Sequence, residues 1–383
     1  MVIAVRSGTS MQTTARRFRV SVSTVSFWVE RVHGMRLDRA DYDDRKSGSA
    51  WNRTSATLER RILALRAKLR RSVLGECGAP AIRTALDAAD AQHLPSLATI
   101  NRVLARHGAQ DHARRVRRPP PPKGWYLPAL AAGQAELDCF DLIEDLKIAN
   151  GPLISVLNGT SLHGGLVDAW PLDPASAKAV LQCLVERWRR EGLPDYAQFD
   201  NDTVFQGTHR FADTVGRVSR LCLALGVVVV FAPPREPGFQ NAIEGFNGLW
   251  QAKLWHRHRF LDLAHLRQLS ARYISAHRAR SAPRREQAPQ RRPFPNRFKL
   301  NLNAPLKGKI IYLRRTDDAG HVHLLGKSFP VSNRWPHRLV RCEVDFTAER
   351  IRFYALRRRQ PQEQPLLRTT KYHRVYRPFK GQP

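Results

Sequence analysis

Three acidic residues at uneven spacing could do chemistry in this sequence: Asp138, Asp200 and Glu244. Two of them are expected at the ends of strands and the third near the start of a helix, so their carboxylates can converge in the fold. Hard divalent cations prefer carboxylate oxygens as ligands. Two such ions can hold the attacking and the leaving oxygen of a displacement at phosphorus. The pattern therefore predicts a site that binds two Mg²⁺ or Mn²⁺ ions and acts on a phosphodiester.

The charge of the chain points to the same kind of substrate. Among 383 residues, 64 Lys and Arg stand against 33 Asp and Glu, which gives a formal net charge of +31. Such an excess favours a polyanionic partner, because binding releases the counterions of that partner. The hydrophobic share of 42% is enough to build cores, and the length predicts several domains. No apolar run is long enough for a membrane span, so we expect a protein inside the cell with no membrane contact.

The elements that position these acids follow two helical modules. Residues 1–46 contain two predicted helices, 13–18 and 22–32, separated by a tight turn, and Ser21 is a favourable N-cap for the second. This is the pattern of a helix-turn-helix unit, whose second helix enters the major groove of DNA. An ordinary helical hairpin is the alternative. The residues predicted to face DNA are Ser23, Thr24 and Ser26.

A second helical module is predicted at residues 54–112, after a connector at 38–49 that is rich in Gly, Ser and Asp. Its three helices are expected at 58–71, 79–89 and 96–107, so that it forms another DNA-binding helix-turn-helix unit. A basic, proline-rich linker follows at residues 113–128. On the third helix of the second module, the residues expected to face DNA are Thr99, Asn101 and Arg102.

The pattern changes to mixed strands and helices in residues 129–298. Strands are predicted at 134–143, 153–157, 165–170, 196–199 and 227–231, with helices at 175–191 and 208–225 and a last helix around Glu244. This order indicates an α/β layer with a mixed five-stranded sheet. Short alternating strands within 305–356 predict a small β-barrel. Residues 357–383 are predicted to be a basic, disordered tail.

Two short motifs carry a family resemblance: Asp200-Asn201, and the segment Asn241-Ala242-Ile243-Glu244. With Asp138, they make the sequence similar to DDE transposases that have an integrase-type, RNase H-like catalytic core, and most similar to the IS481 group of bacterial insertion sequences. The resemblance covers residues 11 to about 356. It implies a multidomain protein with all-α helix-turn-helix modules, an α/β core and a terminal β-barrel.

What the resemblance implies about function is specific. The chain would bind the terminal inverted repeats of a mobile element, cut the DNA strand with Mg²⁺ or Mn²⁺, and join it to target DNA. Asp138, Asp200 and Glu244 would be both the catalytic residues and the metal ligands. The protein would assemble as a homo-oligomer on double-stranded DNA, in the bacterial cytoplasm and associated with the nucleoid. Further DNA contacts are expected from Asn241, Asn247 and Lys253.

The sequence also departs from the family pattern. Asp202 stands where the family commonly has glycine, and Ala135 stands where an aromatic residue is usual. Asp141 and Glu144 are nearby rivals of Asp138, and Asp141 lies on the alternate face of the predicted strand. These differences leave open a catalytically inactive descendant that regulates by binding DNA, and a structure-selective nuclease of the RNase H type is a weaker third possibility.

Overall fold

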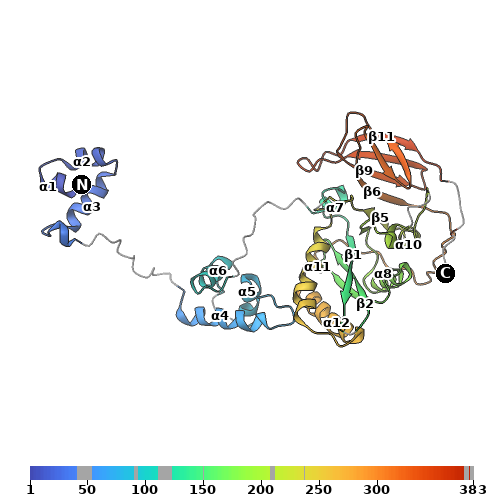
Figure 1. The fold of residues 1–383 in the computed structure, drawn as a ribbon, viewed down its shortest axis with the longest axis horizontal. Helices are drawn as coiled ribbons and strands as arrows, with labels where there is room; N and C mark the ends of the chain where they lie inside the picture. The colour runs from blue at the N-terminus through green and yellow to red at the C-terminus, as the bar shows by residue number, and fades with distance from the viewer. Residues whose placement is uncertain are drawn as a thin grey trace. The chain divides into compact units, whose positions relative to one another are not determined.

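The computed structural model describes residues 1–40, 54–89, 94–110, 123–149, 151–207, 212–236, 238–374 and 379 (Figure 1). The chain divides into two compact units, Met1–Glu59 and Arg60–Pro383. The second unit contains both a small helical part and a large α/β part. Most of the predicted connector and most of the predicted linker lie outside the described residues.

The first unit is helical. The hydroxyl of Ser21 accepts a hydrogen bond from the backbone N–H of Thr24 at 3.1 Å, so this serine caps the second predicted helix as expected. Arg19 adopts the left-handed conformation that ends the helix before it. Val25 and Val32 are buried between the helices. A short first helix was not predicted. The helices are α1 (Val2–Arg6), α2 (Met11–Phe18), α3 (Val22–Arg31) and the 3₁₀ turn η1 (Leu37–Arg39).

Three more helices precede the α/β part, close to the predicted bounds, and the first of them crosses the boundary between the two units. Ser96 caps the third of them by accepting from the N–H of Thr99 at 3.1 Å. Ile62, Ile82 and Ile100 form a fully buried centre, one residue from each helix. The helices are α4 (Ala56–Arg70), α5 (Ala79–Asp87) and α6 (Leu97–Arg106).

The α/β part is built on a mixed sheet, as the sequence predicts. Among the described residues, nine strands join in the order β11-β10-β9-β6-β5-β4-β1-β2-β3. β1 pairs antiparallel with β2 but parallel with β4, and β4 pairs parallel with β5. The five predicted core strands are β1 (Leu137–Lys147), β2 (Leu153–Ser161), β3 (Val167–Leu172), β4 (Tyr196–Phe199) and β5 (Val228–Phe231).

Helices cover both faces of these strands. One apolar cluster joins α8 and α10 to one face, and a second cluster joins α11 and α12 to the other (Figure 1). The longest helix, α12, was not predicted. The bounds are α7 (Pro128–Ala131), α8 (Ala177–Glu191), α9 (Thr203–Gln206), α10 (Arg217–Ala224), α11 (Asn241–Lys253), η2 (Trp255–Arg257), α12 (Leu263–Arg280) and α13 (Ala282–Glu286).

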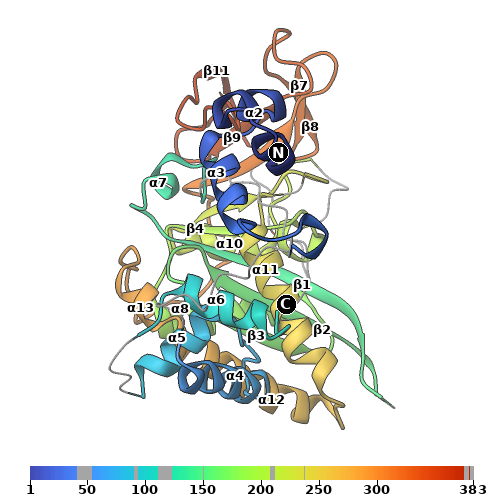
Figure 2. The ribbon, with the colours of Figure 1, turned by 90° about the vertical axis from the view of Figure 1, so that its left-hand side faces the viewer.

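The C-terminal strands lie where the sequence predicts strands, but they do not form a separate barrel. β6 pairs parallel with β5, so the core sheet continues through β6, β9, β10 and β11, which lie at the opposite end of the sheet from β3 (Figure 2). β7 and β8 pair with each other in a separate two-stranded sheet. One strand, β11, falls within residues 357–383, where a disordered tail was predicted. The core sheet is extended because β6 pairs with the edge of β5, and β11 forms because it pairs with the edge of β10. The strands are β6 (Lys309–Arg315), β7 (His321–Leu324), β8 (Lys327–Pro330), β9 (Leu339–Asp345), β10 (Arg350–Ala355) and β11 (Leu366–Lys371).

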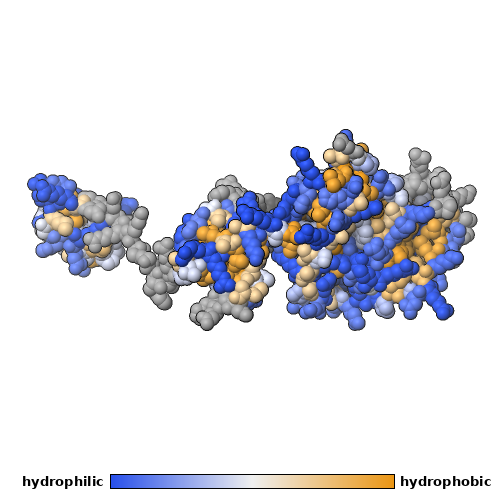
Figure 3. Space-filling view, turned by 90° about the horizontal axis from the view of Figure 1, so that it is seen from below, coloured by the Kyte–Doolittle hydropathy of each residue, from blue (hydrophilic) through white to orange (hydrophobic). Residues whose placement is uncertain are grey.

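Hydrophilic residues cover much of the described surface of the large α/β part on the side seen in Figure 3, with smaller apolar patches between them. Within the described residues, no helix combines the length and the apolar character that a membrane span requires.

Candidate active site

The site begins with the alternation of side chains along β1, since successive residues of a strand point to opposite faces of its sheet. Cys139 and Ile143 pack in the cluster that contains α11, whereas Phe140 packs in the cluster that contains α8. Asp141 therefore lies on the α11 face, together with Cys139. Asp138 lies on the α8 face, together with Phe140.

The register between β1 and β4 brings the second acid alongside Asp141. Leu137 lies opposite Tyr196, and Cys139 lies opposite Gln198, in a parallel pairing. Continuing this register by two residues places Asp200, which directly follows β4, level with Asp141. Asp141, within β1, and Asp200, just after β4, thus lie side by side on two neighbouring parallel strands.

Glu244 completes this group from the first turn of α11, and its side chain is exposed. The pKa of Asp141 is raised to about 7, mainly because the carboxyl is buried, and next because the negative charge of Asp200 lies close by. The charge of Glu244 raises this pKa further. The negative charges of Asp200 and Glu244 therefore both act on Asp141, and a cation bound among the three carboxylates would offset this repulsion.

Two asparagines support Asp141. Asn247, one turn after Glu244 on α11, donates from Nδ2 to a carboxylate oxygen of Asp141 at 2.7 Å. Its own Oδ1 accepts a hydrogen bond at 2.8 Å from Nδ2 of Asn158 on β2, a fully buried residue. The predicted DNA contact Asn247 is therefore a direct neighbour of the carboxylate site, and it ties α11 to the sheet.

The loop after β4 is held by contacts of its own. Asn201 donates to the carbonyl oxygen of Ala232 at 2.7 Å and accepts from the guanidinium of Arg314, on β6, at 2.8 Å. Asp202 caps α9 by accepting from the N–H of Val204 at 2.7 Å. Burial raises the pKa of Asp200, and the nearby charge of Asp202 raises it further. The residue that departs from the family pattern therefore has a structural role as a helix cap.

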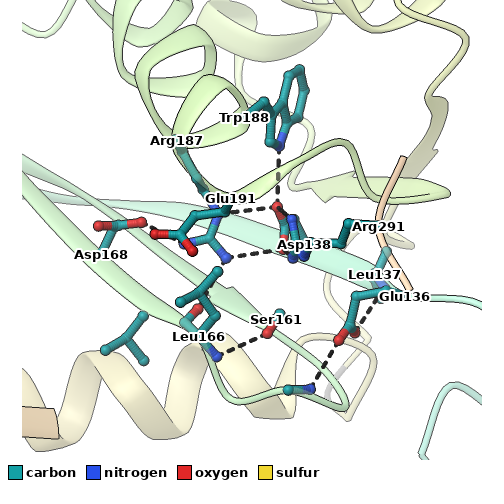
Figure 4. Close-up of polar contacts among 12 residues, drawn as sticks. Glu136, Leu137, Asp138, Ser161, Leu166, Asp168, Arg187, Trp188, Glu191 and Arg291 are labelled. Carbon is teal, nitrogen blue, oxygen red and sulfur yellow. Dashed lines mark hydrogen bonds and ion pairs between the residues drawn. The ribbon is translucent and has the colours of Figure 1, made fainter. Parts of the chain in front are cut away.

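Asp138 does not meet the other two predicted acids, which corrects the sequence-based placement. Its carboxylate is fully buried and accepts hydrogen bonds from Arg187 at 2.9 and 3.0 Å (Figure 4). Arg291 donates to it at 2.5 and 3.2 Å, and Trp188 donates from Nε1 at 3.1 Å. Burial alone would raise its pKa, but the two guanidinium charges hold the pKa of Asp138 well below its usual value.

This buried ion cluster extends to a second aspartate. Arg187 also donates to Asp168, on β3, at 2.5 Å, and Arg278 of α12 donates to the other oxygen of Asp168 at 2.6 Å. The ion cluster thereby joins β1, β3, α8 and α12. Its carboxylates have arginine partners in place, so they are not available as ligands to a cation.

Of the two further predicted DNA contacts on α11, Asn241 begins the helix three residues before Glu244, and Lys253 lies at its other end. Asn241 lines a cavity beside the first turn of the helix. Lys253 ends the helix and donates to the carbonyl oxygen of Gly75 at 3.2 Å. Neither contact tests whether these residues bind DNA.

The predicted DNA-facing residues of α3 and α6 lie within the first two turns of their helices. Ser23 is exposed and Thr24 and Ser26 are half-buried, while Asn101 and Arg102 are exposed and Thr99 is half-buried. The hydroxyls of Ser23, Thr24 and Thr99 lie within 2.8–2.9 Å of those of the capping serines. These positions leave the helix ends open to a partner.

The donor chemistry of Asp141, Asp200 and Glu244 fits a hard divalent cation, because all three supply carboxylate oxygens. Within the described part of the chain, however, no three His, Cys, Asp or Glu side chains are close enough to hold an ion together. The three carboxylates lie on the same face of the sheet, and their charges interact. They are not close enough together to form a complete set of ligands for one ion.

A signal for Asp141 was present in the sequence. The sequence predicts a strand at 134–143 with Asp138 at a strand end, whereas β1 runs from Leu137 to Lys147 and Asp138 lies near its start. The position level with the end of β4 is Asp141. The alternation of side chains along a strand already places Asp138 and Asp141 on opposite faces. Only the pairing of β1 with β4 shows which of them lies beside Asp200.

No protein-family model matches this sequence, and no curated protein is similar enough to count as a relative. Solved structures with some likeness are retroviral integrases. A chain of the simian T-cell lymphotropic virus intasome in complex with PP2A regulatory subunit B56 gamma is 14% identical, with 72% of this chain and 88% of that chain covered and a TM-score of 0.32.

Two catalytic core domains are also similar in part. That of BIV integrase is 17% identical over 37% of this chain and 80% of its own, with a TM-score of 0.26. That of HTLV-2 integrase, in complex with magnesium, is 10% identical over 36% of this chain and 82% of its own, also with a TM-score of 0.26. These values are too low to place the chain in a family or to transfer a function.

Proposed function

We propose that this chain is a DDE-type DNA transposase whose three acidic residues are Asp141, Asp200 and Glu244. The observation that carries the proposal is the grouping of these carboxylates on the α11 face of the sheet, where burial, and after it the charges of Asp200 and Glu244, raise the pKa of Asp141 to about 7. Asp138, which the family motif had suggested, is already neutralised by two arginines. The core is of the RNase H type in this proposal.

Two Mg²⁺ or Mn²⁺ ions bound by these carboxylates would supply a Lewis acid on each side of a phosphodiester and an activated water or 3′-hydroxyl. Other residues of the chain hold these carboxylates in position. Asn247 orients the carboxylate of Asp141, and Arg314 with Asn201 fixes the turn that carries Asp200. Glu244 is the most exposed of the three, and it lies on a helix whose first turn borders the site.

DNA is the substrate that the rest of the chain favours. The net charge of +31 supports tight, salt-dependent binding to a phosphate backbone. Helices α3 and α6 carry small polar and basic residues in their first two turns, as the recognition helices of helix-turn-helix proteins do. We infer that these modules bind the terminal inverted repeats of a mobile element, and that copies of the chain assemble on two such ends and on target DNA.

The test is strand cleavage by the purified full-length protein on DNA from the flanks of its own gene, with Mg²⁺ or Mn²⁺. Asp141→Asn, Asp200→Asn and Glu244→Gln are each expected to lower nicking by on the order of 10³-fold, the equivalent of about 4 kcal/mol of transition-state stabilisation. Binding to the same DNA should stay within a few-fold of wild type. Nicking that survives all three substitutions would disprove the proposed site.

A second candidate is a DNA-binding regulator without catalysis. It is favoured by the absence, within the described residues, of three acidic or other ligand side chains close enough to hold an ion. This candidate predicts sequence-specific binding with no cleavage under either metal, and the same assay distinguishes the two.

A further inference from the structure

Helix α3 of the first unit turns one stripe of side chains outward. Ser23, Phe27 and Glu30 are all exposed. They stand four and three residues apart, a spacing that puts side chains on the same face of a helix. The opposite face packs inward through Val25, which is fully buried. This outward stripe, Ser23–Phe27–Glu30, is the side of α3 that can meet a partner.

The centre of the outward stripe is an aromatic ring. Phe27 is 54% exposed. The ring of Trp28 meets it edge-on, with the ring centres 5.6 Å apart, and the guanidinium carbon of Arg31 lies 5.8 Å from its centre. These neighbours hold the ring at the surface. Because burial of a phenyl ring is favourable, a partner that covers Phe27 gains affinity from it.

The charge of the first unit selects the class of partner. Residues 1–40 carry seven arginines against two acids, Glu30 and Asp38. Such a surface attracts a polyanion, and it repels a second copy of itself. The arginines are Arg6, Arg16, Arg17, Arg19, Arg31, Arg36 and Arg39. The partner that this charge favours is a nucleic acid.

The outward stripe has the chemistry of a surface that meets base edges. Phosphates are held by cations, and none of Ser23, Phe27 and Glu30 is a cation. In the major groove, hydroxyl groups contact any base, carboxylates accept from the amino group of cytosine, and phenyl rings contact the methyl group of thymine. The stripe therefore suits the floor of the groove, while Arg19, in the turn before α3, and Arg31 suit the phosphates beside it.

The position of Phe27 along the helix agrees with this chemistry. It lies in the second turn after the capping residue Ser21, and helix-turn-helix proteins contact base edges with the N-terminal part of the second helix. Phe27 and Glu30 are about 4.5 Å apart along the helix axis, at a rise of 1.5 Å per residue. This is close to the spacing of about 3.4 Å between base pairs, so the two side chains can reach neighbouring pairs.

We propose that Phe27 packs on the C5-methyl group of a thymine in the bound sequence and thereby determines the base that is accepted at that position. The inference rests on the proposed binding of DNA by α3, and it adds the base that one side chain reads. Thymine is the base that presents a methyl group in the major groove, so the contact would discriminate against the other three.

The experiment first lets full-length protein select its binding sequence from a library of random duplexes, without Mg²⁺ or Mn²⁺ so that no strand is cut. Each thymine of the selected sequence is then replaced in turn by uracil, which removes only the methyl group. For wild type, uracil at one position is expected to lower affinity by roughly 3- to 10-fold, as loss of one buried methyl contact does.

Phe27→Ala removes the ring, and Phe18→Ala is the matched control. Phe18 belongs to the same unit, is 45% exposed and has the guanidinium carbon of Arg17 at 5.8 Å from its ring centre, but it ends α2 and lies outside the stripe. The uracil effect should vanish in Phe27→Ala and persist in Phe18→Ala, because only a direct contact couples the ring to the methyl group. Thermal unfolding shows that both variants are folded.

A library without an enriched sequence, a flat uracil profile in wild type, or an equal uracil effect in Phe27→Ala would overturn the inference. So would a Phe27→Ala protein with unchanged DNA affinity and an altered association state in sedimentation, since the ring would then contact another copy of the chain. The proposed catalysis fails separately. Methyl-dependent binding without metal-dependent nicking would keep the role of Phe27 and remove the transposase, and nicking with a flat profile would do the reverse.

Discussion

The two faces of β1 hold aspartates three residues apart that have opposite surroundings. On the α8 face, Asp138 lies between the guanidinium groups of Arg187 and Arg291. On the α11 face, Asp141 is close to two other carboxylates and accepts a hydrogen bond from the neutral Asn247. The pKa of the first is lowered and that of the second is raised.

Burial acts in the same direction on both residues, because low polarity disfavours the charged form of any carboxyl. The difference therefore comes from the partners alone. Where arginines supply the opposite charge, the carboxylate is a structural ion that holds elements together. Where only acids gather, the charge is left for a ligand to neutralise, and that is the arrangement suited to binding cations.

The largest effect expected from this contrast is on stability. Asp138→Asn would leave Arg187 buried with one of its two carboxylate partners removed, and loss of one partner of a buried ion pair costs about 3–5 kcal/mol. Denaturant unfolding measures the change, and Asp141→Asn serves as the control, since it removes a repelled charge and should cost far less. A stable Asp138→Asn protein that no longer nicks DNA would reverse the assigned roles of the two aspartates.

A divalent metal should stabilise the folded protein only through the carboxylates on the α11 face of the sheet. A cation bound at a concentration of 100 times its Kd stabilises the folded state by about 2.7 kcal/mol. Wild type and a folded Asp168→Asn variant should show this gain when Mn²⁺ is added in thermal unfolding, because Asp168 belongs to the arginine-paired cluster. Asp141→Asn and Glu244→Gln should lose most of it. Equal stabilisation of all four proteins would mean that the metal binds elsewhere.

Substitution of Arg314 tests whether an arginine that contacts Asn201 helps to position Asp200. Arg314→Met removes the donor to Asn201 and is expected to cost about 1–3 kcal/mol in unfolding free energy. It should also lower nicking by about 10- to 100-fold, since a small displacement of Asp200 misaligns the site. The neighbouring Arg315 forms a partly exposed pair with Glu236, so Arg315→Met should change stability by less than about 1 kcal/mol. Unchanged nicking in Arg314→Met would show that the turn holds its position without this arginine.

The smallest effect expected is on the unfolding free energy at acid pH. Because the folded-state pKa of Asp138 lies below its ordinary value, its ion pairs contribute stability above about pH 4 and lose it as the pH falls through the folded pKa. The stability difference between wild type and Asp138→Asn should be constant above about pH 5. Below about pH 4 it should shrink by at most about 1.4 kcal/mol per pH unit. Urea unfolding at three pH values measures it, and a difference that grows in acid would contradict the assigned charge state.

Much of the local structure could be read from the sequence. The helix cap at Ser21 is present as predicted, because capping depends only on residues three positions apart. The strand at 196–199 was predicted with its observed bounds, since its apolar residues are bounded by turn-forming ones. The helix that carries Glu244 was expected for the same local reasons.

Pairing partners were not readable in this way. The C-terminal strands were predicted, but their union with β5 in one sheet depends on an edge that is remote in sequence. Residues 366–371 look like a basic tail on their own, and they become a strand only because β10 offers hydrogen bonds to pair with. In each case the hydrogen-bond partner lies in a different segment.

The sequence by itself determined that this chain is strongly basic, that it has helical modules before an α/β core, and that acids stand near the ends of its strands. Only the tertiary structure decided which acids share a face. The parallel register of β1 and β4 sets Asp141 level with Asp200, and the packing of Arg187 and Arg291 gives Asp138 its opposite charges. Register and ion pairing join residues that are far apart along the chain, so no local pattern of residue types contains them.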